Sequence, residues 1–162
     1  MDLVSNFLVG ATTPDIVHID LSDLNAAITG IATLVGANSA LLADASPTVT
    51  AITGAATMTA TAGTDIYSIG HATAWTTTTL ARALEVGGAL ALTTPATYTA
   101  TNGFVVAYDD NANTYLAYVQ STAGTASATT FVANDLTVTN FLQLVGVADA
   151  TTLLTNNVVI IA

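Results

Sequence analysis

Short segments in which threonine alternates with alanine, valine or isoleucine recur along this chain, and they limit its fold more than any other feature. Clear examples are Thr48–Thr53 and Ala56–Thr61, and Asp65–Ile69 follows after the next glycine. β-Branched side chains suit a pleated strand, and threonine at alternate positions leaves one face of the strand polar. We therefore predict a mainly β fold: a threonine-rich β-sandwich or β-roll-like domain with one or two short helices. No linker or run of charges interrupts the 162 residues, so residues 1–162 are expected to form a single β-rich domain.

The clearest predicted hairpin surrounds an acidic turn. Phe104–Tyr108 and Thr114–Val119 are rich in aromatic and β-branched residues, and Asp109–Asn113 between them has the composition of a turn. Alternation in a further strand places Ile16 and His18 on one face. Strands are also predicted near the two ends of the chain, at Leu3–Val9, Asp15–Asp20, Leu136–Val147 and Asn157–Ile161.

A first helix is predicted after Asp20. Asp20, Ser22 or Asp23 is suited to cap its first turn, and Gly36 supplies a stop. The apolar residues that recur at helical spacing in this segment are Ile28, Ile31, Leu34 and Val35. Near the other end of the chain, Asp149 is expected to cap a short helical turn.

A second helix is predicted over Thr78–Val86. Leu80 and Leu84 share one face of it, and two glycines follow as a stop. Arg82 stands three residues before Glu85, so we expect the two side chains to form an exposed ion pair.

The charge balance excludes several classes of partner. The chain has 11 acidic residues against one basic residue, which gives a formal charge of −10. A single arginine cannot neutralise a row of phosphates, so we expect no binding to nucleic acid or to anionic membrane surfaces. The most apolar stretch, Ala26–Ala43, is interrupted by glycine, threonine, asparagine and serine, so no membrane insertion is expected. Cations are better partners for this chain.

The acidic turn is a candidate for weak calcium binding. Asp109, Asp110, Asn111 and Asn113 offer side-chain oxygens in the manner of the first half of an EF-hand loop. Thr114 then stands where an EF-hand has glycine, and Gln120 stands where it has glutamate, so a true EF-hand is excluded. A plain hairpin turn and a weak calcium site both remain open, and calcium is the only cofactor we consider.

No arrangement for catalysis is evident. The chain has no cysteine, no Gly-x-Ser-x-Gly elbow and no glycine-rich phosphate loop. His18 and His71 lie far apart in the sequence without a second ligand at helical or strand spacing, so a core or surface role is expected for both. We therefore predict that the protein is not an enzyme.

Several short motifs resemble the C-terminal non-repeat modules of RTX-type proteins that are exported by type I secretion. Asn6–Gly10 reads N-F-x-x-G, and Asp15–Ser22 reads D-x-I-x-L/I-D-L-S, as in the opening of such a module. Tyr108–Leu116 is similar to the family's Y-D…Y-L hairpin, and Leu144–Val147 to its L-x-G-V strand. The closing segment Asn157–Ile161 has Val158 where the family has an aromatic residue.

The resemblance implies mainly a destination. An uncleaved C-terminal signal and an extracellular or cell-surface location would accompany the absence of a Sec-type leader and of cysteines. The glycine-aspartate nonapeptides of this family are absent from the chain, so a calcium β-roll is not expected.

The terminal strands are candidates for contacts between subunits. Soluble monomers usually protect sheet edges with lysine or other charges, which this chain hardly has. The apolar residues expected to dock are Leu3, Val4, Phe7, Leu8, Val158, Val159, Ile160 and Ile161. We therefore expect a secreted structural protein that assembles with copies of itself into a filament or surface layer, with possible contact to a cell surface or matrix. The alternative is the C-terminal export and folding module of a larger type I-secreted adhesin or hydrolase.

Overall fold

The structure, a computed structural model, describes residues 1–10, 12–20, 33–34, 47–53, 58–59, 66–70, 74–93, 102–122 and 130–161. Strands predominate among the elements of this part of the chain, as predicted from the threonine alternation. In chain order the elements are β1 (Asp2–Ser5), β2 (Val17–Asp20), β3 (Thr33–Leu34), β4 (Val49–Thr53), β5 (Met58–Thr59), β6 (Ile66–Gly70), α2 (Thr77–Leu84), β7 (Leu92–Thr93), β8 (Asn102–Asp109), β9 (Asn113–Ser121), β10 (Leu136–Val145), the 3-10 helices η1 (Ala150–Thr152) and η2 (Thr155–Asn157), and β11 (Val158–Ile161).

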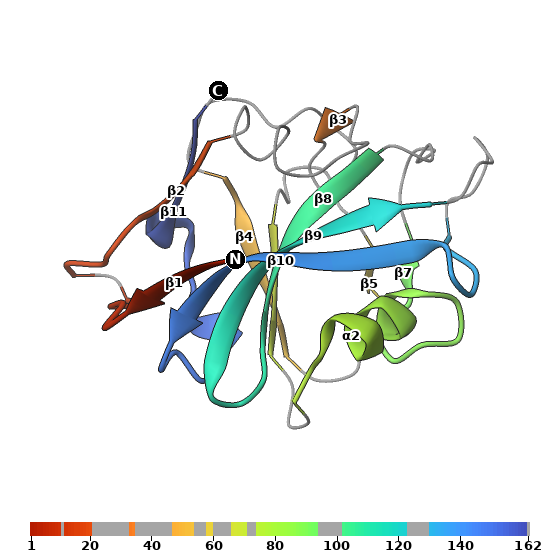
Figure 1. The fold of residues 1–162 in the computed structure, drawn as a ribbon, viewed down its shortest axis with the longest axis horizontal. Helices are drawn as coiled ribbons and strands as arrows, with labels where there is room; N and C mark the ends of the chain where they lie inside the picture. Colours follow the sequence, from red (N-terminus) through yellow and green to blue (C-terminus); the bar gives the residue numbers. More distant parts are fainter. Residues whose placement is uncertain are drawn as a thin grey trace.

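One seven-stranded mixed sheet forms the centre of the molecule (Figure 1). Its strand order is β1-β10-β9-β8-β6-β4, and β3 pairs with β8 outside this path. Only β9 runs antiparallel to its neighbours, since every other pairing within this sheet is parallel. Within the described residues, β1 and β4 end the order, so both are edge strands. The predicted hairpin is confirmed as β8 and β9 around the acidic turn.

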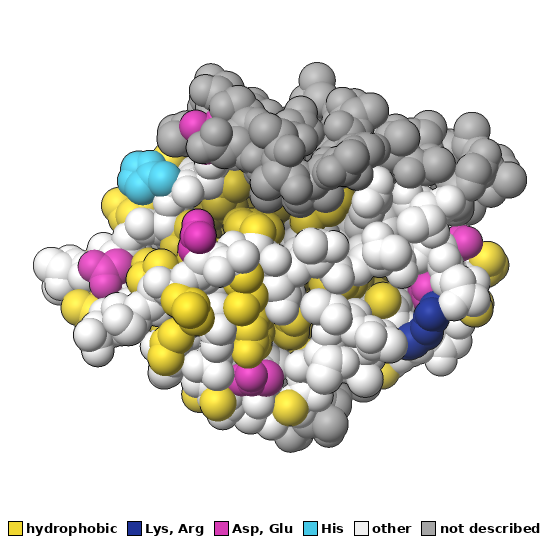
Figure 2. All heavy atoms as spheres, in the orientation of Figure 1, with side chains coloured by type: hydrophobic (Ala, Val, Ile, Leu, Met, Phe, Trp, Pro, Cys, Tyr) yellow, Lys and Arg dark blue, Asp and Glu magenta, His cyan; other side chains and the backbone are white. Residues whose placement is uncertain are grey.

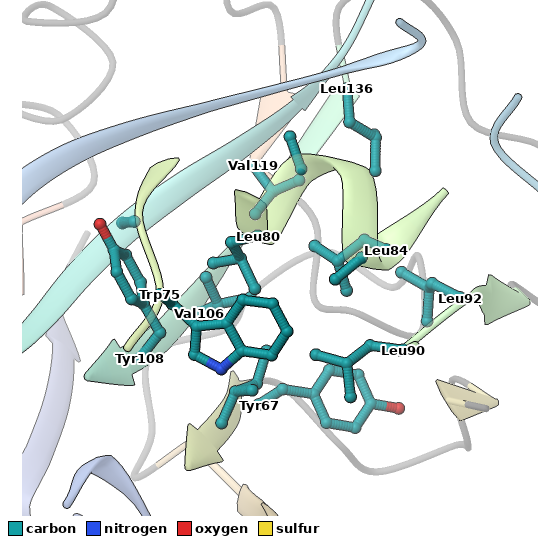
Figure 3. Packing of buried hydrophobic residues seen from close by; sticks show 14 of the residues in the cluster. Tyr67, Trp75, Leu80, Leu84, Leu90, Leu92, Val106, Tyr108, Val119 and Leu136 are labelled. Carbon is teal, nitrogen blue, oxygen red and sulfur yellow. The ribbon is translucent and has the colours of Figure 1, made fainter. Parts of the chain in front are cut away.

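One face of the sheet is covered by α2 and the segments beside it. Leu80 and Leu84 of α2 point at the sheet and are fully buried, as their helical spacing predicted. They pack with Trp75, Leu90 and Leu92 on the inward side chains of the strands (Figure 3). The strand side chains on this face, which we call the helix face, include Tyr67, Val106, Tyr108, Val119 and Leu136.

The opposite face is covered by a small second sheet. β2 and β11 pair in parallel, and they bury Val17, Ile19, Val158 and Ile160 against the main sheet. The strand side chains that they meet are those at the alternate positions, such as Val105, Ala107, Leu116 and Leu144. Sheet-on-sheet packing on this face is consistent with the predicted mainly β class.

The second predicted helix is confirmed. Thr76 caps α2 by accepting from the Thr79 backbone N–H at 3.1 Å, and the Thr79 side chain accepts from the Thr76 N–H at 2.8 Å. This reciprocal pair satisfies two amide groups at the helix start. Gly87 follows the helix at φ +83°, a conformation that residues with a Cβ rarely adopt, which explains why a glycine ends the helix here.

The first predicted helix is wrong where the structure describes it. Thr33 and Leu34 form β3, which pairs in parallel with Asn102 and Gly103. Short apolar runs rich in β-branched residues suit helix or strand, and pairing with β8 decides between them. The remainder of that predicted helix lies outside the described residues.

Two terminal strands are shorter than predicted. β1 ends at Ser5 instead of Val9, because Asn6 adopts φ +59° and turns the chain out of the strand. β11 begins at Val158, directly after η2. Asp149 caps η1 by accepting from the Thr151 N–H, as predicted. In the described part of the chain, no helix is long and apolar enough to cross a membrane.

Candidate assembly surface

The edge strand β1 leaves apolar side chains at the surface. It pairs only with β10 among the described strands, in a register that places Leu3 beside Gln143 and Val4 beside Leu144. Val4 packs partly against the core beneath the β2–β11 sheet, whereas the Leu3 side chain is 68% exposed. Asp2 is the single charged side chain of this strand. β1 therefore carries one charged side chain, Asp2, and exposes the side chain of Leu3 to solvent.

A β-bulge in β10 shapes the surface beside β1. The register between β10 and β9 shifts between Asn140 and Leu142, so Phe141 is an extra residue. Leu136 and Val138, before the bulge, lie on the helix face of the sheet. Leu142 and Leu144, after the bulge, pack on the opposite face, in the core between the two sheets. An extra residue reverses the side-chain alternation, which is the usual consequence of a bulge. The bulge thereby places Leu142 next to β1.

An open groove lies between β1 and β2. Its volume is about 400 Å³, and both polar and apolar atoms line it, from five apolar residues, one acid and one histidine: Val4, Phe7, Asp15, Ile16, Val17, His18 and Leu142. We call this feature the β1 groove. Ile16 is 48% exposed and His18 is exposed on the same side of β2, as the predicted alternation requires. Figure 2 shows hydrophobic side chains gathered on the visible face over the region of β1 and β10.

Hydrogen bonds hold the loop that carries the groove. The Leu8 N–H donates to Asp15 Oδ2 at 2.9 Å, and the Asp15 N–H donates to the Leu8 carbonyl at 3.0 Å. The buried Asn157 amide donates to the Asp15 carbonyl at 3.0 Å and to the Leu8 carbonyl at 3.4 Å. Gly10 allows the turn, because its φ of +130° is disfavoured for other residues. The groove is thus fixed by contacts from both ends of the chain.

The predicted docking residues divide into two groups. Leu3 and Leu8 are exposed, and Val4 and Val159 are half-buried. Phe7, Val158 and Ile160 belong to the core between the two sheets, so their side chains cannot reach a neighbouring molecule in this fold. The side chain of Ile161 lies outside the described residues. Burial follows from the parallel pairing of β11 with β2, which a local sequence pattern does not show.

The acidic turn is closed by its own carboxylates. Asp110 Oδ1 accepts from the backbone N–H groups of Ala112 and Asn113, and Asp110 Oδ2 accepts from the Tyr115 hydroxyl at 2.8 Å. Burial alone would raise the pKa of Asp110, but these hydrogen bonds outweigh it and lower the pKa below its usual value. Burial and the same Asp110 carboxylate raise the pKa of Tyr115 to about 12.

Asp109 faces inward and fixes the loop before β11. It is 2% exposed, and its Oδ2 accepts from the Ala150 N–H at 3.1 Å while its Oδ1 accepts from the Asn111 N–H at 3.2 Å. The buried Ser68 hydroxyl donates to the Ala150 carbonyl, so both backbone groups of Ala150 are held by the sheet. Desolvation raises the pKa of Asp109, and the nearby Asp149 and Asp110 charges add to this effect.

The four predicted calcium ligands therefore lie together, and their hydrogen bonds stabilise the turn and its contacts. Asn111 takes φ +67° in it, and Asn113 Oδ1 accepts from the Gly146 N–H at 3.2 Å. Among the described residues, no three His, Asp or Glu side chains are grouped so as to hold a metal ion. Weak calcium binding by Asp109, Asp110, Asn111 and Asn113 stays a prediction. His71 lies outside the described residues.

Arg82 and Glu85 form the predicted ion pair, but the expectation that it is exposed is wrong. Arg82 Nη1 lies 2.7 Å from Glu85 Oε2, and the two side chains are 49% and 3% exposed. Glu85 Oε1 also accepts from the N–H groups of Asn134 and Leu136, at 2.9 and 3.3 Å. Glu85 is buried because the start of β10 folds over the end of α2, a long-range contact that helical spacing alone does not reveal.

The end of α2 carries a second apolar surface that sequence reasoning missed. The Val86 N–H donates to the Phe131 carbonyl at 2.7 Å, and the side chains of Val86 and Val132 are both exposed. Neither valine stood out in the sequence, because Val86 ends the predicted helix and Val132 stands between Phe131 and Ala133, where nothing marks it as exposed. We call Val86, Val132 and the half-exposed Arg82 the α2 end.

Comparison of the chain with protein-family models, with curated proteins and with solved structures found no match.

Proposed function

We propose that the protein is a structural subunit that assembles with copies of itself into an extracellular filament or surface layer. The observation that carries this proposal is the edge strand β1 with its exposed Leu3, lying beside the β1 groove. Monomeric proteins usually blunt such edges with lysine, proline or several charges. Here the one basic side chain of the chain is Arg82 on α2, and β1 keeps only Asp2.

The chemistry of strand addition fits this surface. An extended segment that joins a sheet edge gains main-chain hydrogen bonds, and pockets for its side chains add specificity. β1 is already extended and paired on one side, so it can accept a neighbour without rearrangement. The β1 groove offers a hollow beside that edge, lined by apolar side chains together with Asp15 and His18. We therefore assign the β1 groove and the β1 edge together to the joint between subunits.

Electrostatic repulsion between subunits opposes assembly. Each subunit has a formal charge of −10, so packing subunits brings like charges together unless cations reduce the repulsion. We propose that divalent cations such as calcium take this role, at the acidic turn or between subunits. The extracellular location in this proposal rests on the motif resemblance to RTX-type proteins. If the chain is instead an export module of a larger protein, it is expected to stay monomeric.

Sedimentation velocity over a concentration series, with electron microscopy of the same samples, tests the proposal. The wild type is expected to form species of increasing mass, while Leu3→Asp stays monomeric over about a tenfold wider range of concentration. Leu3 is exposed, so this change should not disturb the fold. Thr78→Asp is the matched control, because Thr78 is exposed at the start of α2 and the variant has the same net charge. A wild type that stays monomeric at every concentration contradicts the proposal.

A further inference from the structure

Two strands near opposite ends of the chain, β2 and β11, lie side by side. They pair in parallel, with Val17 beside Val158 and Asp20 beside Ile161. Among the described strands these two pair only with each other. Figure 1 shows that the chain from β1 reaches β2 at one end of this pair, while the C-terminus follows β11 at the opposite end. Tension between the ends of the chain therefore pulls β2 and β11 in opposite directions along their common axis.

A parallel pair resists this direction of force best. The hydrogen bonds of a parallel ladder are evenly spaced along the strands. A force along the strands loads all of these bonds at once, because none is lost until the whole register slips. A force across the strands loads the bonds at one end first and breaks them one pair at a time. The ends of this chain apply the first kind of force.

Buried side chains add to the resistance against slipping. Four side chains of the pair lie in the core between the two sheets: Val17, Ile19, Val158 and Ile160. A slip by one residue exchanges the two faces of a strand. It would therefore bring His18 of β2 or Val159 of β11 towards the core in place of these apolar side chains, and the apolar burial that holds the register would be lost.

A buried asparagine joins the segment before β2 to the start of β11. The Asn157 amide donates to the Asp15 carbonyl at 3.0 Å and to the Leu8 carbonyl at 3.4 Å. Its Oδ1 accepts from the Leu154 N–H at 3.0 Å, which holds the side chain in place. Because Asn157 stands directly before Val158, these bonds carry load together with the ladder.

The pair encloses most of the chain. All strands of the main sheet except β1 belong to residues 21–157, which lie between β2 and β11 in the sequence. Tension cannot extend this part of the chain while the pair holds. β1 itself offers less resistance, because three of its four side chains are exposed and Val4 is half-buried. Load that enters through β1 is thus passed on to β2.

We propose that the β2–β11 pair is a mechanical clamp, which carries tension between the ends of the chain and keeps this tension off the main sheet. The clamp depends on the register of two strands and not on self-assembly. It would act in the same way in a filament subunit and in a module of a longer protein, because the load arrives through the segments before β2 and after β11 in both.

Single-molecule force spectroscopy in two pulling directions tests the clamp. Ile16 is 48% exposed directly before β2, and the chain has no cysteine, so Ile16→Cys provides a defined attachment point. In the first direction the second attachment follows Ala162, which loads the pair along its strands. In the second direction it is Leu154→Cys, at a side chain that is 43% exposed, which pulls the N-terminal ends of both strands apart. At equal force, the unfolding rate is expected to be at least about tenfold lower in the first direction.

Two mild variants show where the barrier to forced unfolding lies. Ile160→Val shortens a buried side chain of the clamp, and Ile69→Val does the same in β6 of the main sheet. In the first direction, Ile160→Val should raise the unfolding rate about two- to tenfold, whereas Ile69→Val should leave it unchanged. Equal unfolding rates in the two directions, or an equal effect of the two variants, would contradict the clamp. Because single molecules are measured, neither result depends on whether the protein assembles.

Discussion

Asp109 holds the backbone of Ala150: its Oδ2 accepts from the Ala150 N–H at 3.1 Å, and the contact is buried. This bond, with the Ser68 hydroxyl on the Ala150 carbonyl, fixes the loop that precedes η2 and β11. The position of the β2–β11 sheet, and with it one wall of the β1 groove, therefore depends on a carboxylate at the end of β8.

The stability of the protein should depend on pH with opposite signs at Asp109 and Asp110. The pKa of Asp109 is raised above its usual 3.8 in the folded state. Between pH 3.8 and this raised pKa, the folded state therefore binds more protons than the unfolded state. The stability of the wild type relative to Asp109→Asn should thus be greatest at low pH and fall as pH rises through the raised pKa. Urea denaturation between about pH 3 and pH 7 measures it.

Asp110 provides the control for this experiment. Its pKa is lowered, so its contribution is present above the usual 3.8 and is lost as pH falls through the lowered value. The stability of the wild type relative to Asp110→Asn should therefore decrease on acidification. Equal slopes for the two variants would show that the environments of the two carboxylates do not differ as described.

Removing Glu85 should destabilise the protein more than an exposed ion pair would. Glu85→Ala leaves the Asn134 and Leu136 N–H groups and Arg82 Nη1 without the Glu85 acceptor, and we expect a loss of about 2–3 kcal/mol. Glu85→Gln keeps an acceptor oxygen and should lose about half as much. Thermal and urea denaturation give both values. A loss of only about 0.5 kcal/mol for Glu85→Ala, the magnitude of an exposed pair, would contradict the buried network.

Three tyrosines should respond differently to loss of the hydroxyl. The Tyr118 hydroxyl is buried and has no hydrogen-bond partner among the described residues, so Tyr118→Phe should raise the free energy of unfolding by up to about 1 kcal/mol. The Tyr108 hydroxyl donates to Asn140 Oδ1 at 2.9 Å, and the Tyr115 hydroxyl donates to Asp110 Oδ2 at 2.8 Å. Tyr108→Phe and Tyr115→Phe should each lower the stability by about 1 kcal/mol. A destabilised Tyr118→Phe would indicate a partner for that hydroxyl.

Calcium should promote assembly by reducing charge repulsion. At neutral pH and low ionic strength, a chelator is expected to lower the yield of polymer, because the formal charge of −10 per subunit is then uncompensated. Acidification to about pH 4, near the Asp pKa, should replace calcium by removing charge. Polymer yield after centrifugation is the measurement. An unchanged yield at neutral pH in the presence of chelator means that calcium has no part in assembly.

The sequence predicted the elements whose formation depends on residues close together in the chain. Strand alternation located β8, β9 and their turn, and helical spacing with a following glycine located α2. The sequence did not show which side chains of β10 face which side of the sheet, because a single extra residue, Phe141, reverses the alternation of side chains along this strand. Nor was the burial of Glu85 or Val158, since each depends on pairing with a segment far away in the chain. The β1 groove likewise depends on the long-range pairings of β1 with β10 and of β2 with β11.

Hydrogen exchange of β1 tests the central claim most directly, because it reads the backbone groups at the edge of the sheet. The amides of residues 2–5 that do not pair with β10 should exchange rapidly in the monomer, as expected for an open edge. In assembled protein they should exchange at least about tenfold more slowly, together with those of the loop around Asp15 and Ile16 that borders the groove. Polymers in which this region exchanges as fast as in the monomer would contradict assembly through β1 and its groove.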